Sequence, residues 1–117
     1  MKEKRFHISS VGETALLTLY ARAIESQSED PILKDEKAEA IIQELDPVLV
    51  DRDTKMARQL YQRSIDPKLI VHLALRAEKY DRYAKEFLKI HPGRTIVNLG
   101  CGMDTRFFRI DDGKLQS

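Results

Sequence analysis

Residues 95–106 place a short apolar segment directly before a loop that contains two glycines. The apolar part, residues 96–99, is partly β-branched and predicts a buried strand. Gly100 and Gly102 follow at once, and glycine lacks the Cβ that would keep the backbone from turning sharply beside a ligand. Open α/β sheets hold nucleotide-like cofactors in such loops, at the carboxyl end of a strand. The pattern therefore predicts an α/β fold with a cofactor-binding loop.

Composition excludes several classes of partner. A length of 117 residues is typical of one domain, and a net charge of +1 creates no field that would attract nucleic acid or an anionic membrane. The chain has no apolar run of the ~20 residues that a membrane-spanning helix needs, and no secretory signal. One cysteine and three scattered histidines offer neither a disulfide nor metal-ligand spacing. We expect a cytoplasmic protein without metal, nucleic-acid or membrane partners.

Amphipathic segments occupy most of the chain before residue 91. Apolar residues recur there at helical spacing and predict four helices. We also expect a loose N-terminal arm, a short helix after the glycine loop and a turn near the C-terminus. In chain order these are an arm over residues 1–11, helices over 13–26, 36–44, 53–63, 67–90 and 105–109, and a turn over 111–113.

Residue types at the helix ends sharpen these boundaries. Asp35 and Asp66 are predicted N-caps, and Pro67 suits the first position of a helix, where its missing N–H costs nothing. Asp46 and Pro47 are expected to end the second helix. The longest helix is expected to bury one apolar face, made by Leu69, Ile70, Leu73, Ala74, Ala77, Tyr80, Ala84, Phe87 and Leu88.

A lone strand is unusual, because it cannot satisfy its own backbone donors and acceptors. Each buried polar group without a partner costs about 1–3 kcal/mol. Three explanations are open: the chain is the front part of a longer one, the strand pairs with another molecule, or residues 96–99 form no strand in this piece. We favour the first as the origin of the sequence.

The loop and its surroundings resemble a known family. The motif Val97-Asn98-Leu99-Gly100-Cys101-Gly102-Met103-Asp104-Thr105-Arg106-Phe107 is similar to the first cofactor motif of the leucine carboxyl methyltransferases, a family of class I S-adenosylmethionine-dependent enzymes. Residues 13–23, 30–35 and 74–81 resemble the same family, so the likeness covers nearly the whole chain. Common class I enzymes have an acid in place of Asn98 and a third glycine in place of Asp104, and both departures are typical of this family.

The resemblance implies how the chain is organised. Residues 1–92 would form a helical layer that covers the cofactor, and residues 93–117 would begin a seven-stranded Rossmann-like core. The fold class is therefore α/β, although this segment would be mostly helical and would contain only the first strand of that core.

The resemblance also implies a binding site for S-adenosylmethionine. Arg76 matches a family arginine that pairs with the methionine carboxylate of the cofactor, and a planar guanidinium can grip a carboxylate with two hydrogen bonds. The loop would approach the rest of the cofactor, with Asn98 as a brace and with Asp104 and Thr105 either as ligand contacts or as helix caps. The predicted cofactor-binding residues are Arg76, Asn98, Gly100, Cys101, Gly102, Asp104 and Thr105; no catalytic residue is predicted.

The implied reaction is methyl transfer to a carboxylate or hydroxyl oxygen of a small molecule or a protein C-terminus. We expect the 117 residues alone to be inactive, because the acid that holds the ribose and the acceptor site lie in strands they do not contain. One alternative is a helical interaction module that self-associates through exposed apolar faces. Another is a nicotinamide-dependent oxidoreductase, which is disfavoured because Thr105 replaces the third glycine and Asp104 would repel phosphate.

Overall fold

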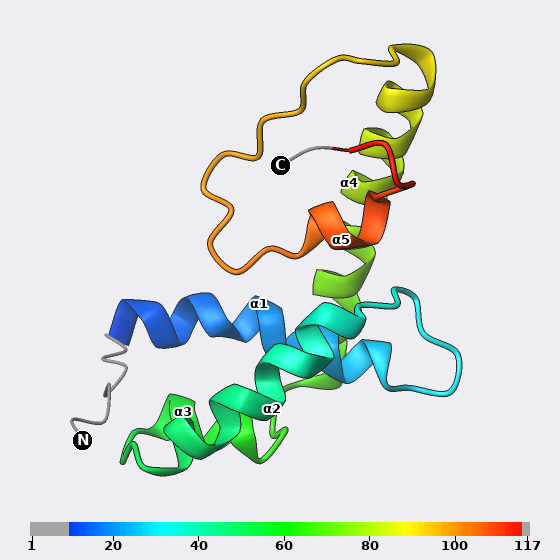
Figure 1. Cartoon of the computed structure of the whole chain (residues 1–117). Helices are drawn as coiled ribbons and strands as arrows, with labels where there is room; N and C mark the ends of the chain where they lie inside the picture. Colours follow the sequence, from blue (N-terminus) through cyan, green and yellow to red (C-terminus); the bar gives the residue numbers. More distant parts are fainter. Residues whose placement is uncertain (1–9, 116–117) are drawn as a thin grey trace, which may run out of the picture.

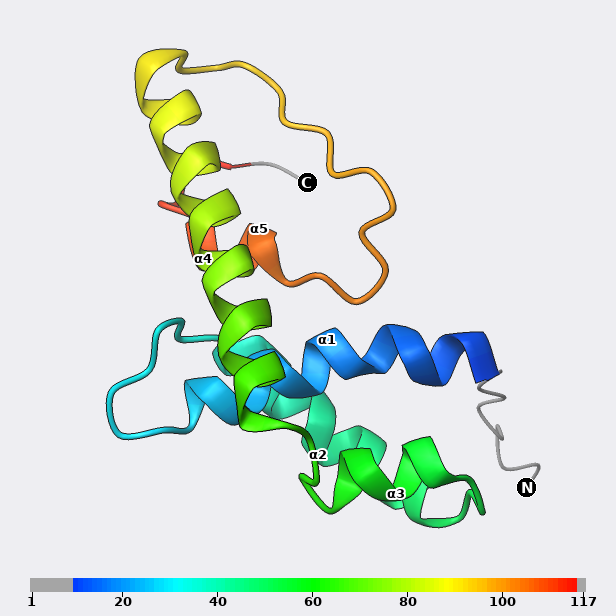
Figure 2. The ribbon, with the colours of Figure 1, turned by 180° about the vertical axis from the view of Figure 1, so that it is seen from behind.

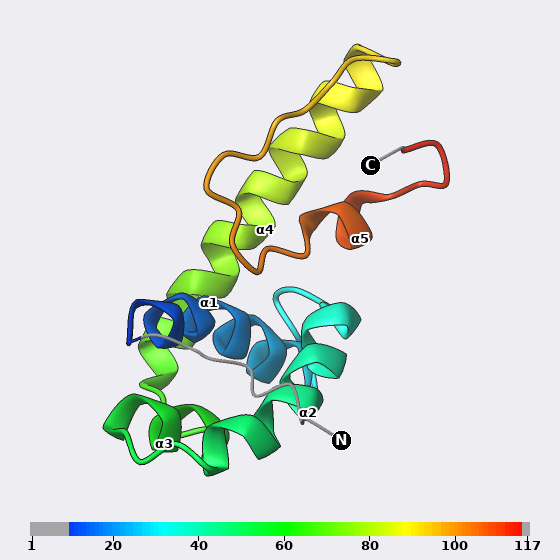
Figure 3. The same cartoon turned by 60° about the vertical axis from the view of Figure 1, so that its left-hand side comes forward.

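The computed structural model describes residues 10–115, in which five helices are joined by loops (Figure 1). The first three helices gather at one end of the molecule, and the fourth extends away from them with the fifth beside its middle (Figures 1 and 3). None of these described helices combines the length and the apolar character needed to cross a bilayer. The elements are α1 (Ser10–Ser26), α2 (Glu36–Val50), α3 (Lys55–Tyr61), α4 (Pro67–Ile90) and α5 (Arg106–Ile110).

Helix starts agree with the capping residues in the sequence. The carboxylate of Asp35 accepts a hydrogen bond from the N–H of Ala38, and that of Asp66 accepts one from Lys68. Both predicted N-caps are therefore confirmed, as are the bounds of α4. The loose arm predicted for residues 1–11 lies outside the described residues except at its last two, with which α1 begins.

The predicted end of α2 is wrong. Pro47 lies inside the helix, which continues to Val50. A proline in a helix interior removes one backbone hydrogen bond and is unfavourable by about 3 kcal/mol. The extra turn offsets this cost because it brings Leu49 into the core, where its side chain is fully buried and contributes about 1.5–3 kcal/mol of apolar burial. Tertiary packing thus overrides the local signal.

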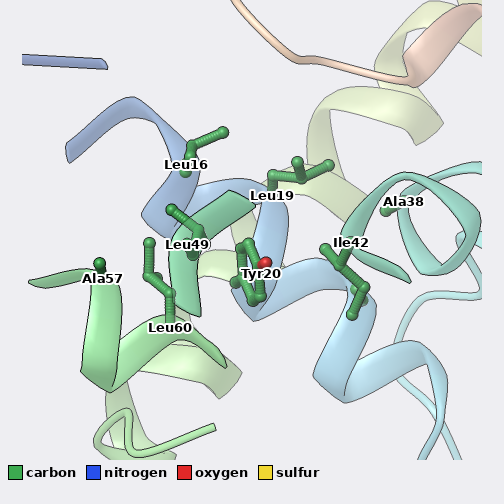
Figure 4. Close-up of a cluster of buried hydrophobic side chains, with 9 residues drawn as sticks. Leu16, Leu19, Tyr20, Ala38, Ile42, Leu49, Ala57 and Leu60 are labelled. Carbon is green, nitrogen blue, oxygen red and sulfur yellow. The ribbon is translucent and has the colours of Figure 1, made fainter. Parts of the chain in front are cut away.

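The main core lies between α1, α2 and α3 (Figure 4). α1 supplies the residues at its centre, and a smaller cluster on another side of α1, made by Ala21, Ile70 and Leu73, joins it to α4. Figure 2 shows α4 crossing α1 and continuing beyond the other helices. The buried residues of the main core are Leu16, Leu19, Tyr20, Ala23, Ala38, Ile42, Leu49, Ala57 and Leu60.

The predicted apolar face of α4 is buried along only part of its length. Ile70 and Leu73 are buried against α1, but Tyr80 is 56% exposed and Phe87 is 39% exposed. Leu69, at the start of the helix, is 36% exposed. Beyond the crossing with α1, α5 is the described helix that packs on α4 (Figure 3), so most apolar side chains there have nothing to bury them.

The strand predicted for residues 96–99 is absent from the part of the chain that the structure describes. This segment has no regular secondary structure, and Val97 and Leu99 are 73% and 87% exposed. A strand needs a neighbour to accept and donate its ladder hydrogen bonds, and residues 10–115 supply none. The third explanation considered for the lone strand therefore describes this structure.

Candidate functional site

An open pocket of about 470 Å³ lies where α1, α4 and the glycine loop meet. The loop leaves the far end of α4, arcs away from it and returns toward α1 and α5 (Figures 1 and 2). Six of the seven predicted cofactor-binding residues line the pocket, which brings together positions far apart in the sequence. They are Arg76, Asn98, Gly100, Cys101, Gly102 and Asp104.

The glycine loop depends on backbone conformations that other residues rarely adopt. Gly100 and Gly102 have φ angles of +58° and +50°, in the left-handed region. A Cβ built on either glycine would meet no atom within 4 Å, so the requirement is conformational and not steric. The N–H of Asp104 donates to the carbonyl of Cys101 over 2.8 Å and closes the turn. The loop therefore has bare backbone at the pocket wall.

Asn98 and Asp104 brace the two ends of this loop. The Asn98 amide Nδ2 donates to Oδ2 of Asp104 over 2.8 Å, and Oδ1 of Asp104 accepts from the backbone N–H of Arg106. Burial raises the pKa of Asp104, but the Asn98 hydrogen bond and the guanidinium groups of Arg106 and Arg109 outweigh it. The pKa of Asp104 is therefore below its ordinary value, and the carboxylate is ionised at neutral pH.

Arg76 presents an unpaired guanidinium to the pocket. It projects from α4, is exposed, and makes no ion pair or side-chain hydrogen bond within residues 10–115. Two other arginines of the pocket wall differ, because Arg22 pairs with Asp35 and Arg106 pairs with Asp81. An unpaired cation in a pocket with polar walls is suited to an anionic group of a ligand.

Behind the pocket, Asp35 collects donors from three elements. Its Oδ1 caps α2, and its Oδ2 accepts from Arg22 Nε at 3.1 Å, Thr105 Oγ1 at 2.6 Å and Arg109 Nη1 at 3.0 Å. Asp35 is 1% exposed and Thr105 is 3% exposed. Thr105 is thus the predicted site residue that the structure places outside the pocket wall, in a buried polar cluster. Its hydroxyl does not cap α5.

A second carboxylate, Asp81 of α4, completes this cluster. Arg109 grips it with two hydrogen bonds, from Nε at 2.6 Å and from Nη2 at 2.9 Å, and Arg106 donates from Nε at 3.0 Å. Burial lowers the pKa of Arg109, but Asp81 and Asp35 hold that pKa above its usual value. The cluster pairs three arginines with three aspartates: Arg22, Arg106 and Arg109 with Asp35, Asp81 and Asp104.

Comparison with known proteins identifies the family. The family model described as leucine carboxyl methyltransferase matches residues 15–116. The chain belongs to this family.

Curated relatives of this leucine carboxyl methyltransferase family member carry methyltransferase names. The tetracenomycin polyketide synthesis O-methyltransferase TcmP of Streptomyces glaucescens is 34% identical over 104 residues, which cover 89% of this chain and 34% of TcmP. The S-adenosyl-L-methionine-dependent methyltransferase dpfgK of Gibberella zeae is 32% identical over 104 residues, covering 88% of this chain and 34% of that protein. The chain therefore spans about a third of the length of the curated relatives it matches. No solved structure matches it significantly.

The buried cluster of this family member was not predicted from the sequence, although Asp35 was predicted as a cap, and Asp104 and Thr105 as ligand contacts or caps. Two signals could have found part of it. Arg22 follows Ala15 by seven residues and Leu19 by three, so a charged side chain lies on the apolar face of α1. Asp81 likewise follows Ala74 by seven residues on α4. A charge on an apolar helix face indicates a buried partner, because a buried charge must be paired.

Proposed function

We propose that this chain supplies part of the S-adenosylmethionine site of an O-methyltransferase. The names of its relatives support S-adenosylmethionine as the cofactor, and the pocket supports the proposed location of its binding site. The methionine end of the cofactor carries a carboxylate, which suits the unpaired guanidinium of Arg76. The backbone of Gly100 and Gly102 can lie close to a ligand because no side chain projects from it.

Arg76 is the observation that carries the proposal. Other arginines around the pocket are already paired with carboxylates. The guanidinium of Arg76 is not, so it can pair with a ligand. A well-formed hydrogen bond to a charged group contributes about 1.5–3 kcal/mol, which corresponds to roughly a 10- to 150-fold change in Kd. We expect Arg76 to hold the methionine carboxylate and thereby fix the direction in which the cofactor lies.

The proposed reaction is methyl transfer to an oxygen of a carboxylate or a hydroxyl, on a small molecule or a protein C-terminus. When bound, S-adenosylmethionine supplies a methyl group on a sulfonium, which is a good leaving group. The residues of this chain contribute by orienting the cofactor and shielding it from water. We propose that turnover also needs residues beyond this sequence, in keeping with its coverage of about a third of its relatives.

Titration of the 117-residue chain with S-adenosylhomocysteine, followed by NMR, tests the proposed site. We expect Arg76→Ala to raise Kd at least tenfold. Arg94→Ala is the matched control, because Arg94 is also exposed and unpaired within the described residues but does not line the pocket. Methylthioadenosine, which lacks the carboxylate, should bind the wild type and Arg76→Ala equally.

Three outcomes contradict the proposal: no binding of S-adenosylhomocysteine, equal effects of Arg76→Ala and Arg94→Ala, or preferential binding of a nicotinamide dinucleotide. In a radiolabelled-methyl assay we expect the chain alone to show no turnover, whatever acceptor is offered.

We also propose an alternative function, self-association, for which the exposed aromatic side chains of α4 are the supporting observation. Tyr83 is 53% exposed and Phe87 is 39% exposed on the outer half of α4, beside the exposed residues 96–98. Apolar patches of this kind commonly mark interaction surfaces. Sedimentation velocity should then show a concentration-dependent shift that a Tyr83→Ser, Phe87→Ser double variant abolishes. A concentration-independent monomer argues against this function.

A further inference from the structure

The buried carboxylate of Asp35 makes more hydrogen bonds than a helix cap requires. One oxygen is enough to cap α2, and Oδ1 does so by accepting from Ala38. The other oxygen, Oδ2, accepts from Arg22, Thr105 and Arg109. Two of these three donors lie at or after the end of the glycine loop, about 70 residues away from Asp35 along the chain. Asp35 therefore links the start of α2 to the loop.

Arg22 extends this link to the backbone of the loop. Its Nε donates to Asp35, and its Nη2 donates to the carbonyl of Met103 over 2.9 Å. The guanidinium is planar, so fixing one edge on Asp35 also fixes the direction of the other nitrogens. Burial lowers the pKa of Arg22, and Asp35 offsets this effect only in part, as expected for a charge held between elements away from water.

The end of the loop is held at two points by this one carboxylate. Met103 is tied to it through Arg22, and Thr105 is tied to it directly. Little apolar packing competes with these bonds, because Gly100, Cys101 and Gly102 are exposed and Met103 is 39% exposed. The polar contacts are thus what fixes the end of the loop against α1 and α2.

We propose that Asp35 is a positioning residue, which acts through Arg22 and Thr105 to set the conformation of residues 100–104 at the pocket wall. The consequence for cofactor affinity rests on the function proposed above, whereas the effect on the loop does not.

Cys101 offers a reporter of the loop that needs no engineering. It is the single cysteine of the chain, it is exposed, and it lies within the loop. A nitroxide attached to its sulfur reports local mobility by electron paramagnetic resonance without any cofactor. We expect Asp35→Asn to free the loop, because the new amide N–H₂ would face the donor groups of Arg22 and Thr105 and could not accept their hydrogen bonds. A more mobile loop should narrow the spectral lines relative to the wild type.

Glu13→Gln is the matched control. Glu13 is 3% exposed and accepts from an arginine Nε (Arg52) and a threonine hydroxyl (Thr54), as Asp35 does, but it does not line the pocket. Both substitutions should lower the melting temperature, because each removes the carboxylate that pairs with an arginine, the buried Arg22 or the half-buried Arg52. Line narrowing should occur in Asp35→Asn and not in Glu13→Gln, which separates positioning from general destabilisation.

A second pair of variants covers the case in which Asp35→Asn does not fold. Thr105→Val keeps the shape of the side chain but removes the hydroxyl that donates to Asp35 and accepts from Arg109 over 2.6 Å. Thr105→Ser keeps the hydroxyl. We expect narrowed lines for Thr105→Val and wild-type lines for Thr105→Ser. Folded variants whose lines all match those of the wild type overturn the proposal.

The cofactor measurement distinguishes this inference from the proposed function. If both hold, S-adenosylhomocysteine binds Asp35→Asn about tenfold more weakly than it binds the wild type or Glu13→Gln. If the spectral lines narrow in Asp35→Asn but no variant binds S-adenosylhomocysteine, the positioning role stands and the proposed function fails. Affinity that is equal in wild type, Asp35→Asn and Thr105→Val, with unchanged lines, refutes the positioning role alone.

Discussion

Two isoleucines of α4 show how differently the two ends of the molecule are held. Ile70, where α4 crosses α1, is 7% exposed, whereas Ile90 at the far end of the same helix is 70% exposed. We call α1, α2, α3 and residues 67–77 of α4 the packed region, and the rest of α4 with residues 91–104 the open region. The same residue type on one continuous helix is buried in the first and bare in the second.

The difference shows that an apolar helix face is buried only where another element packs against it. The packed region is held by hydrocarbon contacts around α1 (Figure 4). By contrast, ion pairs hold α5, through Asp35 at the start of α2 and through Asp81 in the open part of α4. Apolar contact is non-directional, while hydrogen-bonded ion pairs fix orientation. The candidate site therefore lies where directional contacts take over from packing.

Truncation of the two isoleucines should show the largest contrast. We expect Ile70→Ala to lower the free energy of unfolding by about 2–4 kcal/mol, because it leaves a cavity against α1. Ile90→Ala should change that free energy by less than about 0.5 kcal/mol, since Ile90 is already in water. Urea unfolding followed by circular dichroism measures both. Equal losses would show that the open region is packed in solution.

A polar contact inside the packed region should give an intermediate effect. The hydroxyl of Tyr20 donates to Asp46 over 2.7 Å, and burial together with this carboxylate raises the pKa of the phenol. Tyr20→Phe removes the hydrogen bond while keeping the fully buried ring. We expect it to destabilise the chain by about 1–2 kcal/mol, measured by urea unfolding. No change would mean that Arg63 alone satisfies Asp46.

Acid should loosen the open region through Asp104. Its folded pKa is lower than the unfolded value of about 3.9, so the ionised form stabilises the fold above that pH. This contribution is lost as the pH falls below about 4 and through the folded pKa. Between pH 7 and pH 3, Asp104→Asn should therefore lose less stability than the wild type, by an amount smaller than the effect of Tyr20→Phe. Asp46→Asn is the control in the packed region, where the pKa is also lowered.

The smallest effect is expected from an ion pair on the surface of α4. Glu78 and Arg82 are one helical turn apart, with side chains 36% and 58% exposed. Glu78→Gln should change stability by about 0.5 kcal/mol or less, and the change should vanish at high salt. A larger effect in thermal unfolding would indicate that this face of α4 is covered in solution.

Local signals in the sequence were sufficient to predict features that a single residue and its backbone neighbours determine. Asp35, Asp66 and Pro67 set helix starts through bonds to their own backbone neighbours, so the starts of α2 and α4 were predicted correctly. The glycine loop was predicted for the same reason, since the freedom to turn sharply comes from the missing Cβ of glycine itself. The end of α2 was missed, because the burial of Leu49 is decided by distant residues.

The sequence by itself determined the capped helices, the left-handed glycines and the family to which the chain belongs. The tertiary structure alone decided that residues 96–99 form no strand, that the outer half of α4 is exposed and that Asp35, Thr105 and Arg109 meet in one buried cluster. The physical reason is the range of the interactions. Caps and turns act within a few residues, whereas strand pairing, burial and ion pairing depend on partners that only the folded chain brings close.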